Sequence, residues 1–416
     1  MSITKRVLAI TVIFIFATIA WAILGSTIFA RTYGMDESLR SRVGTNWGTA
    51  QTQLPPSASY QRRRWETRDV EQFNKTVTKT VEVKETILLP LESTRANVAL
   101  FLEHRQKGLL WYATYKVNFQ AEYSFRNTSD TYEEVTLSLP LPAEQALYDD
   151  LRFELNGVPV ATENQKNSVH ASIHMSPGQV AKLSTGYKSQ GLDRWQYQFG
   201  EQVAQVRDFD LRMTTNFKDI DFPDNTLSPG EKRETAAGWD LHWQYSNLLS
   251  GYEIGMVMPE KLQPGPLAGR ISFFAPVSLF FFFFLVFIIT TIRGIDIHPM
   301  NYFFLAAAFF AFHLLMAYLV DHVSIHAAFA AGAAVSLALV ISYMRLVAGT
   351  RFAWIECGLA QLVYLVGFSY AFFFKGFTGL SVTIGSIITL FIVMQMTGRI
   401  NWSERFARKP VTVTPS

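Results

Sequence analysis

Hydrophobic positions follow two unlike patterns along the chain. One continuous apolar run extends from Val7 to Phe29, about 240 mostly polar residues follow, and five more apolar runs lie close together between Ile271 and Gly398. Each run comes near the roughly 20 residues that a helix needs to cross a hydrocarbon core about 30 Å thick. The pattern therefore predicts six transmembrane helices, one N-terminal and five C-terminal.

The five C-terminal runs are separated from one another by only a few residues. Such short connections favour an up-and-down antiparallel bundle, and backbone groups in lipid have to be hydrogen-bonded within each helix. The predicted spans are Ser272–Ile292, Asn301–Leu319, Ile325–Val347, Phe352–Phe374 and Thr378–Thr397.

The first run has the character of a membrane anchor. It follows Lys5 and Arg6 and is longer than the apolar core of about 7–15 residues found in secretory signals. Ile28 stands where a cleavage site ending at Ala30 would carry a small residue. We therefore expect a retained anchor, with a cleaved leader as the alternative.

Basic residues gather at one set of span ends. The two short turns on the opposite side carry only Asp321 and Lys375 as fixed charges. By the positive-inside rule, we expect both termini in the cytoplasm and residues 31–270 on the other side of the membrane. The residues that carry this asymmetry are Lys5, Arg6, Arg293, Arg345, Arg351, Arg399, Arg405, Arg408 and Lys409.

The polar block reads as β structure. Apolar and polar residues alternate in segments such as Tyr115–Phe125, which is typical of half-buried strands. Asn156-Gly157 is the strongest hairpin signal in the chain. Many short strands between turn residues predict an antiparallel sandwich, with a barrel as the alternative. Residues Thr32 to about Arg64 are expected to form a short helix and a loop.

These patterns define a membrane protein of the α+β class with four regions. We expect a transmembrane anchor at 1–30, an extracytoplasmic antiparallel-β, sandwich-like domain at 31–270, a five-helix bundle at 271–398 and a cytoplasmic tail at 399–416. The net charge of +3, without a basic cluster outside the membrane flanks, argues against nucleic-acid binding. Cys357, the only cysteine, lies in an apolar run, so disulfides and paired-cysteine zinc sites are excluded.

The candidate binding residues lie in and beside the third span. His313 falls near the middle of that span, and an ionisable side chain at such depth is a functional candidate. Asp321, His322 and His326 surround the following outer turn. The plainer alternative is a neutral imidazole that bonds a neighbouring helix, solvated turn residues, and a Glu356 that pairs with Arg351 or Arg345.

Motifs for catalysis or metal binding are missing from the sequence. His170 and His174 share a face, but on a strand they stand about 13 Å apart, and no Glu lies between them. There is no Gly-x-Ser-x-Gly and no phosphate-binding loop. We therefore expect a protein that is not an enzyme and that needs no cofactor or metal.

Three short motifs carry a resemblance to a known family. The turn Gly294-Ile-Asp-Ile-His298-Pro299-Met-Asn301-Tyr resembles the His-Pro-Met-x-Tyr turn of the CreD family of bacterial inner-membrane proteins. Gly238-Trp-Asp-Leu-His242-Trp243-Gln, before the membrane block, and Gly398-Arg-Ile-Asn401-Trp402, after it, are similar to two further family segments. The resemblance covers roughly Gly238 to Trp402 and the layout of the remainder.

The resemblance implies a multi-pass protein of the bacterial inner membrane that supports envelope integrity and the stress response. It implies no catalytic residues, so we expect the β domain to act by binding a membrane lipid, an envelope protein or an envelope polymer, in an unknown oligomeric state. Pro299 is expected to start the third helix. The first rival is a small-solute or lipid transporter, flippase-like, that uses His313; the second is a periplasmic hydrolase.

Overall fold

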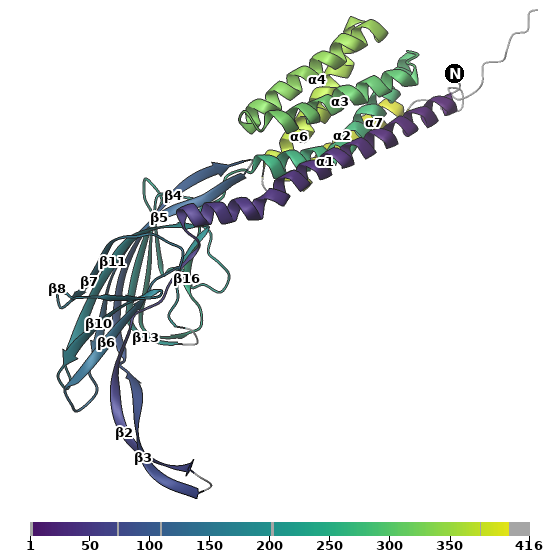
Figure 1. The fold of residues 1–416 in the computed structure, drawn as a ribbon. Helices are drawn as coiled ribbons and strands as arrows, with labels where there is room; N and C mark the ends of the chain where they lie inside the picture. The colour runs from purple at the N-terminus through teal and green to yellow at the C-terminus, as the bar shows by residue number, and fades with distance from the viewer. Residues whose placement is uncertain (1–2, 73–74, 109, 201–203, 375, 399–416) are drawn as a thin grey trace, which may run out of the picture. The chain divides into compact units, whose positions relative to one another are not determined.

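The computed structural model describes residues 3–72, 75–108, 110–200, 204–374 and 376–398, and the chain divides into two compact units (Figure 1). The membrane unit comprises residues 1–37, 108–110 and 262–416. The β domain comprises residues 38–107 and 111–261. The predicted tail at 399–416, with Asn401 and Trp402, lies outside the described residues.

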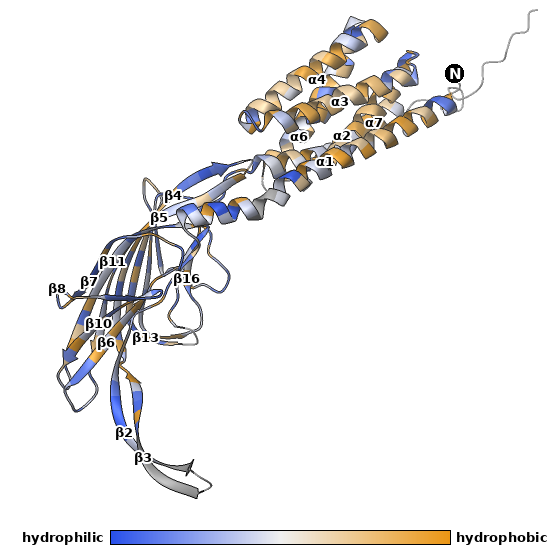
Figure 2. Cartoon of the chain, in the orientation of Figure 1, coloured by the Kyte–Doolittle hydropathy of each residue, from blue (hydrophilic) through white to orange (hydrophobic). Residues whose placement is uncertain are grey.

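Six helices in the described residues are long and apolar enough to cross a membrane, which confirms the predicted six spans. Figure 2 shows the apolar character that these helices share. The helices are α1 (Ile3–Trp47), α2 (Pro264–Arg293), α3 (Pro299–Leu319), α4 (Ile325–Ala348), the fifth span (Phe352–Phe373) and α7 (Thr378–Thr397).

The α1 helix is much longer than its apolar run. It continues to Trp47, which agrees with the helix expected after Thr32, whereas the loop expected to reach about Arg64 is shorter, because strands begin at Gln51 and Ser57. No proline occurs between Ile3 and Trp47, and nothing in this polar stretch breaks the helix before Gly48. Gly48 has φ 116°, and a Cβ there would lie 2.2 Å from the Gln190 carbonyl oxygen. Glycine is therefore the residue that ends this helix.

The membrane end of α1 belongs to the core of the membrane unit. Trp21 is fully buried, and its ring meets Phe310 edge-on with 5.5 Å between the ring centroids. Arg31 donates to Asp321 over 3.0 Å. These contacts make α1 part of the packing of the membrane unit.

The fifth span is an irregular helix. Two π-helical segments, η1 (Phe352–Gly358) and η2 (Leu362–Gly367), flank the short α5 (Leu359–Gln361), and α6 (Phe368–Tyr370) and η3 (Ala371–Phe373) complete the span. A π turn is wider than an α turn, and such turns are frequent at functional positions. Hydropathy alone predicts the span but not this irregularity.

The β domain is built from three sheets. Their strand orders are β14-β15-β13-β4-β5-β11-β7-β8, β3-β2-β6-β10-β9 and β1-β12-β16. Among the described residues, most strand pairs are antiparallel, while β13 with β4 and β1 with β12 are parallel, so the predicted antiparallel β-rich domain is confirmed. The strands are β1 (Gln51–Gln53), β2 (Ser57–Gln72), β3 (Lys75–Leu88), β4 (Leu91–Lys107), β5 (Leu110–Arg126), β6 (Glu133–Pro140), β7 (Tyr148–Leu155), β8 (Val158–Pro159), β9 (Glu163–Gln165), β10 (Ser168–Met175), β11 (Val180–Leu192), β12 (Arg194–Tyr197), β13 (Ala204–Thr215), β14 (Glu231–Glu234), β15 (Trp239–Ser250) and β16 (Ile254–Val257).

One hydrophobic core is shared by the inner faces of the sheets, as in a sandwich. Strand alternation puts Val117, Phe119 and Tyr123 of β5 inside, while Lys116, Gln120 and Glu122 point outward. Phe119 stacks on Tyr187 of β11, with 5.1 Å between ring centroids. The domain is therefore held by aromatic packing.

The hairpin predicted at Asn156-Gly157 is confirmed. It joins β7 to β8, and both residues have positive φ, 47° and 79°, as a tight primed turn requires. The β2–β3 hairpin forms a long two-stranded ribbon: β2 pairs with β6 only from Ser57 to Tyr60, and with β3 from Ser59 to Gln72 (Figure 1).

Candidate functional site

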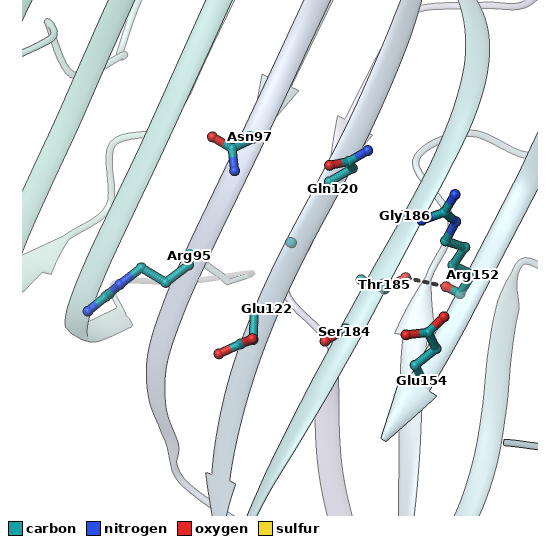
Figure 3. A pocket seen from close by; sticks show the side chains of 10 residues that line it. Arg95, Asn97, Gln120, Glu122, Arg152, Glu154, Ser184, Thr185 and Gly186 are labelled. Atoms are coloured by element: carbon teal, nitrogen blue, oxygen red, sulfur yellow. Dashed lines mark hydrogen bonds between the residues drawn. The ribbon is translucent and has the colours of Figure 1, made fainter. Parts of the chain in front are cut away.

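The exposed face of the eight-stranded sheet carries a polar hollow of about 250 Å³. Its walls come from the four neighbouring strands β4, β5, β11 and β7. Figure 3 shows the side chains that stand on these strands around the hollow. The polar lining residues are Arg95, Asn97, Gln120, Glu122, Arg152, Glu154, Ser184 and Thr185.

The floor of this hollow depends on Gly186 of β11. It faces Gln120 across the strand pair, and a Cβ at Gly186 would lie 3.0 Å from the Phe119 carbonyl oxygen. A larger residue would fill the centre of the hollow. The register between β11 and β7 shifts just beyond Gly186, and such bulges bend a sheet locally.

Two aspartates with left-handed backbone hold cations of neighbouring strands in place. Both carboxylate oxygens of Asp208 (φ 39°) accept from one guanidinium nitrogen of Arg95, Nη2, at 2.8 and 2.7 Å. Asp150 (φ 53°) accepts from the Lys188 ammonium at 2.6 Å, and this contact holds the pKa of the Asp150 carboxyl below its usual range. Arg95 and Lys188 are thereby fixed along the same face.

A second hollow of about 320 Å³ continues the first. Asn118 and Lys188 lie two residues from Gln120 and Gly186 on the same strands, about 7 Å further along. Here the polar lining meets apolar side chains, Phe101 and Leu147. We call the two hollows together the sheet groove.

The charges of the first hollow balance. Two arginines, Arg95 and Arg152, stand with two glutamates, Glu122 and Glu154, and amides fill the space between them. Glu122 also lies 3.4 Å from the Lys182 ammonium. A lining of this kind offers hydrogen-bond donors and acceptors in a plane without a net charge.

The candidate residues of the third span do not form one cluster. His313 is fully buried: its Nδ1 lies 3.0 Å from the Phe309 carbonyl oxygen, while its Nε2 has no partner. Asp321 pairs with Arg31. His322 is exposed, and the exposed His326 lies against the Phe373 ring at 5.0 Å. Within the described residues, no group of three or more His, Cys, Asp or Glu could hold a metal.

The polar residues of the fifth span face the other helices. Glu356 pairs with Arg293 of α2 at 2.5 Å, so the pairing expected with Arg351 or Arg345 is wrong. The Gln361 amide donates to Ser336 at 2.8 Å, and Ser336 donates to the Ala308 carbonyl at 2.6 Å. Sequence spacing cannot show these contacts, because they join different helices.

The described motif residues that carried the family resemblance cap a helix, form hydrogen bonds or lie in the core. His298 caps α3 by accepting from the Met300 amide, and Pro299 is the first residue of the helix, as expected. Asn301 accepts from the Tyr343 hydroxyl at 2.7 Å. Trp243 is fully buried and donates to the Leu227 carbonyl, while His242 lies 3.1 Å from Asp210.

A family model described as inner membrane protein CreD matches residues 2–403. The chain belongs to the CreD family. The match extends the resemblance seen at Gly238–Trp402 through the whole β domain. This CreD family member is therefore a multi-pass inner-membrane protein with six apolar helices and a large β-rich domain.

Two solved structures show a weak similarity to part of this CreD family member. One is a proposed nutrient-binding protein of Legionella pneumophila, with 11% identity, a TM-score of 0.31 and coverage of 47% of this chain and 74% of that chain. Another is an M1 zinc metallopeptidase of Deinococcus radiodurans, with 11% identity, a TM-score of 0.27 and coverage of 41% and 42%. No curated protein matches the sequence.

The sheet groove contains the residues that sequence reasoning missed. Exposed polar residues on strands look like an ordinary solvated face, so Asn97, Gln120 and Arg152 gave no signal. Gly186 inside a strand pattern was the available hint, because an isolated glycine there often marks a bulge or a close approach.

Proposed function

We propose that this CreD family protein supports the integrity of the cell envelope by binding an envelope polymer through its β domain, without catalysis. In this proposal the domain lies in the periplasm, both termini lie in the cytoplasm, and the helices hold the domain at the membrane. The observation that carries the proposal is the sheet groove.

The shape of the groove supports an extended ligand. From Glu122 to Lys116 the face runs along six steps of β5, or about 20 Å. A single small solute would occupy only one of the two hollows. A chain molecule could contact both.

The chemistry of the groove supports a glycan. Amide, carboxylate and guanidinium groups pair well with neighbouring hydroxyls and with N-acyl groups. Phe101 and Leu147 offer apolar surface to the C–H face of a sugar ring. The balanced charges make a strongly anionic polymer a poor match.

The direct test is co-sedimentation of the purified full chain with isolated cell-wall sacculi. The wild type is expected to sediment with the sacculi. A double variant, Asn97→Trp with Ser184→Trp, places two large side chains in the first hollow and is expected to lose most of this binding. Arg233→Trp is the matched control, because Arg233 is an exposed residue of β14, at the edge of the same sheet. Equal sedimentation of the wild type and the double variant would count against the proposal.

A further inference from the structure

We infer that the membrane unit binds an anionic phospholipid between α1 and α2, with an acyl chain in an apolar groove and the phosphate at Arg6. This site is separate from the sheet groove and does not depend on the glycan proposal. Its position at the cytoplasmic leaflet rests on the proposed orientation.

The apolar part of the site is a groove of about 520 Å³, which we call the α1–α2 groove. Ile10 and Phe14 of α1 face Phe280, Phe284 and Phe287 of α2. Phe280 and Phe284 stack almost in parallel, with 6.0 Å between their centroids, so one wall is flat. The one polar lining residue, Thr11, donates its hydroxyl proton to the Val7 carbonyl. The wall therefore offers only apolar contact, which matches an acyl chain.

Arg6 stands at one end of this groove. Its guanidinium carbon lies 5.7 Å from the centroid of the Phe287 ring, which lines the groove. The Arg6 side chain is only 10% exposed. The cation is thus held at the edge of the apolar wall, where the headgroup of a lipid in the groove would lie.

The Arg6 guanidinium has few partners for a buried charge. It donates to the Thr290 hydroxyl at 3.2 Å and lies 3.7 Å from Asp296, whose side chain is 90% exposed. Its Nε has no partner. A buried cation without a close counter-charge loses much of its solvation energy, and phosphate oxygens could restore it through paired hydrogen bonds.

Two other arginines of the membrane unit, unlike Arg6, have close carboxylate partners. Arg31, near the other end of the membrane part of α1, lies 3.0 Å from Asp321, and Arg293 lies 2.5 Å from Glu356. Each of these has a close carboxylate, whereas Arg6 has the neutral Thr290 hydroxyl and a longer contact with the solvent-exposed Asp296 carboxylate. Among these three, Arg6 is the cation that an external anion would neutralise.

Tyr302 supplies a second donor. Its ring is fully buried and meets Phe283 of the groove edge-on, at 5.2 Å between centroids. Its hydroxyl has no hydrogen-bond partner. The Thr290 and Arg6 side chains lie next to this hydroxyl. A phosphate at Arg6 would bring an acceptor close to this unused donor.

The test is native mass spectrometry of the full chain, purified with equal amounts of phosphatidylglycerol and phosphatidylcholine. The wild type is expected to retain more phosphatidylglycerol than phosphatidylcholine. Arg6→Gln is expected to lower that retention roughly tenfold, since it removes a charged hydrogen-bond donor. Arg31→Gln, at the other end of the membrane part of the helix, is the matched control and should leave retention unchanged.

A second variant tests the groove without touching the cation. Ile10→Trp fills the α1–α2 groove and is expected to lower phosphatidylglycerol retention with Arg6 intact, which keeps the test decisive if Arg6→Gln fails to fold. Inorganic phosphate should not displace the lipid, because it lacks the acyl chain. Equal retention by the wild type and both variants would overturn the inference. Displacement by phosphate alone, or a change of oligomeric state in Ile10→Trp without lipid loss, would overturn it too.

Discussion

The β domain and the membrane unit place their polar groups in opposite ways. In the β domain, aromatic rings fill the core and the polar side chains of the sheet groove stand on the outside, with Arg95 and Lys188 fixed by aspartates. In the membrane unit much of the outer surface is apolar, and polar side chains such as His313 and Gln361 are buried among the helices. The β domain therefore exposes many of its polar side chains on one face, whereas several polar groups of the membrane unit lie among its helices.

Removing an aromatic ring from the core of the β domain should have the largest effect on one unit alone. Phe119→Ala leaves a cavity beside Tyr187 and Trp195 and should destabilise the β domain by about 3–5 kcal/mol. Limited proteolysis of the full chain should then cut within residues 38–261 while the membrane helices stay protected. Phe309→Ala, in the separate core of the membrane unit, is the control and should show the opposite pattern. Loss of both units together in either variant would show that the cores are not independent.

Neutralising Glu356 should weaken the membrane unit. Glu356→Gln leaves Arg293 without its carboxylate and should cost roughly 1–3 kcal/mol, a value reduced by the partial exposure of Arg293. Thermal unfolding in detergent measures this loss. Adding Arg293→Gln should restore part of the stability, since no unpaired charge then remains. A double variant as unstable as the sum of both single variants would argue against the pair.

High pH should destabilise the β domain through its buried tyrosines. Burial raises the pKa of Tyr148 from its ordinary value of 10 to about 12, and burial also raises the pKa of Tyr115, Tyr123 and Tyr187. Below pH 10 the phenols are neutral in both folded and unfolded chains, so stability is fully present. Above pH 10 the unfolded chain ionises first, and stability is lost as the pH rises towards 12.

Ultraviolet absorbance of tyrosinate, followed together with circular dichroism, checks this expectation. Ionisation of the buried rings should coincide with loss of β structure. Tyr148→Phe should reduce the steepness of the transition. Full ionisation near pH 10 with the fold intact would contradict the assigned burial.

Replacing His313 should have the smallest effect. His313→Leu places an apolar side chain of similar size against Trp21; it loses the contact with the Phe309 carbonyl but also removes the unpartnered Nε2, so stability should change by less than about 1.5 kcal/mol. If the helices only support the β domain, this variant should complement a deletion strain as well as the wild type. If the variant is present in the membrane at normal abundance but does not complement, the result would favour the alternative function, a transporter that uses His313.

The parts of the fold that depend on local pattern could be predicted. Apolar runs of spanning length predicted the six helices, Asn156-Gly157 predicted its hairpin, and His298-Pro299 predicted the start of α3. A helix was expected after Thr32, but its continuity with the membrane helix up to Trp47 was missed, because a polar helix has no apolar signal. The parallel pairing of β13 with β4 depends on contacts between residues more than 100 positions apart, which no local pattern records.

The candidate site was harder to predict for the same reason. Arg95, Gln120, Arg152 and Ser184 come from four strands and meet only because of the order of the sheet. His313 drew attention because it interrupts an apolar run, although the structure gives it a single backbone contact. Sequence reasoning therefore found residues that stand out locally and missed those that the sheet brings together.

The measurement that tests the central claim most directly is the survival of a deletion strain under detergent, lysozyme and osmotic challenge. The strain would carry the wild-type chain, the Asn97→Trp and Ser184→Trp double variant, or the Arg233→Trp control, each at equal membrane abundance. Wild type and control are predicted to restore survival, and the groove-filled variant is predicted to fail. Full rescue by the groove-filled variant would contradict the claim that the sheet groove carries the envelope function.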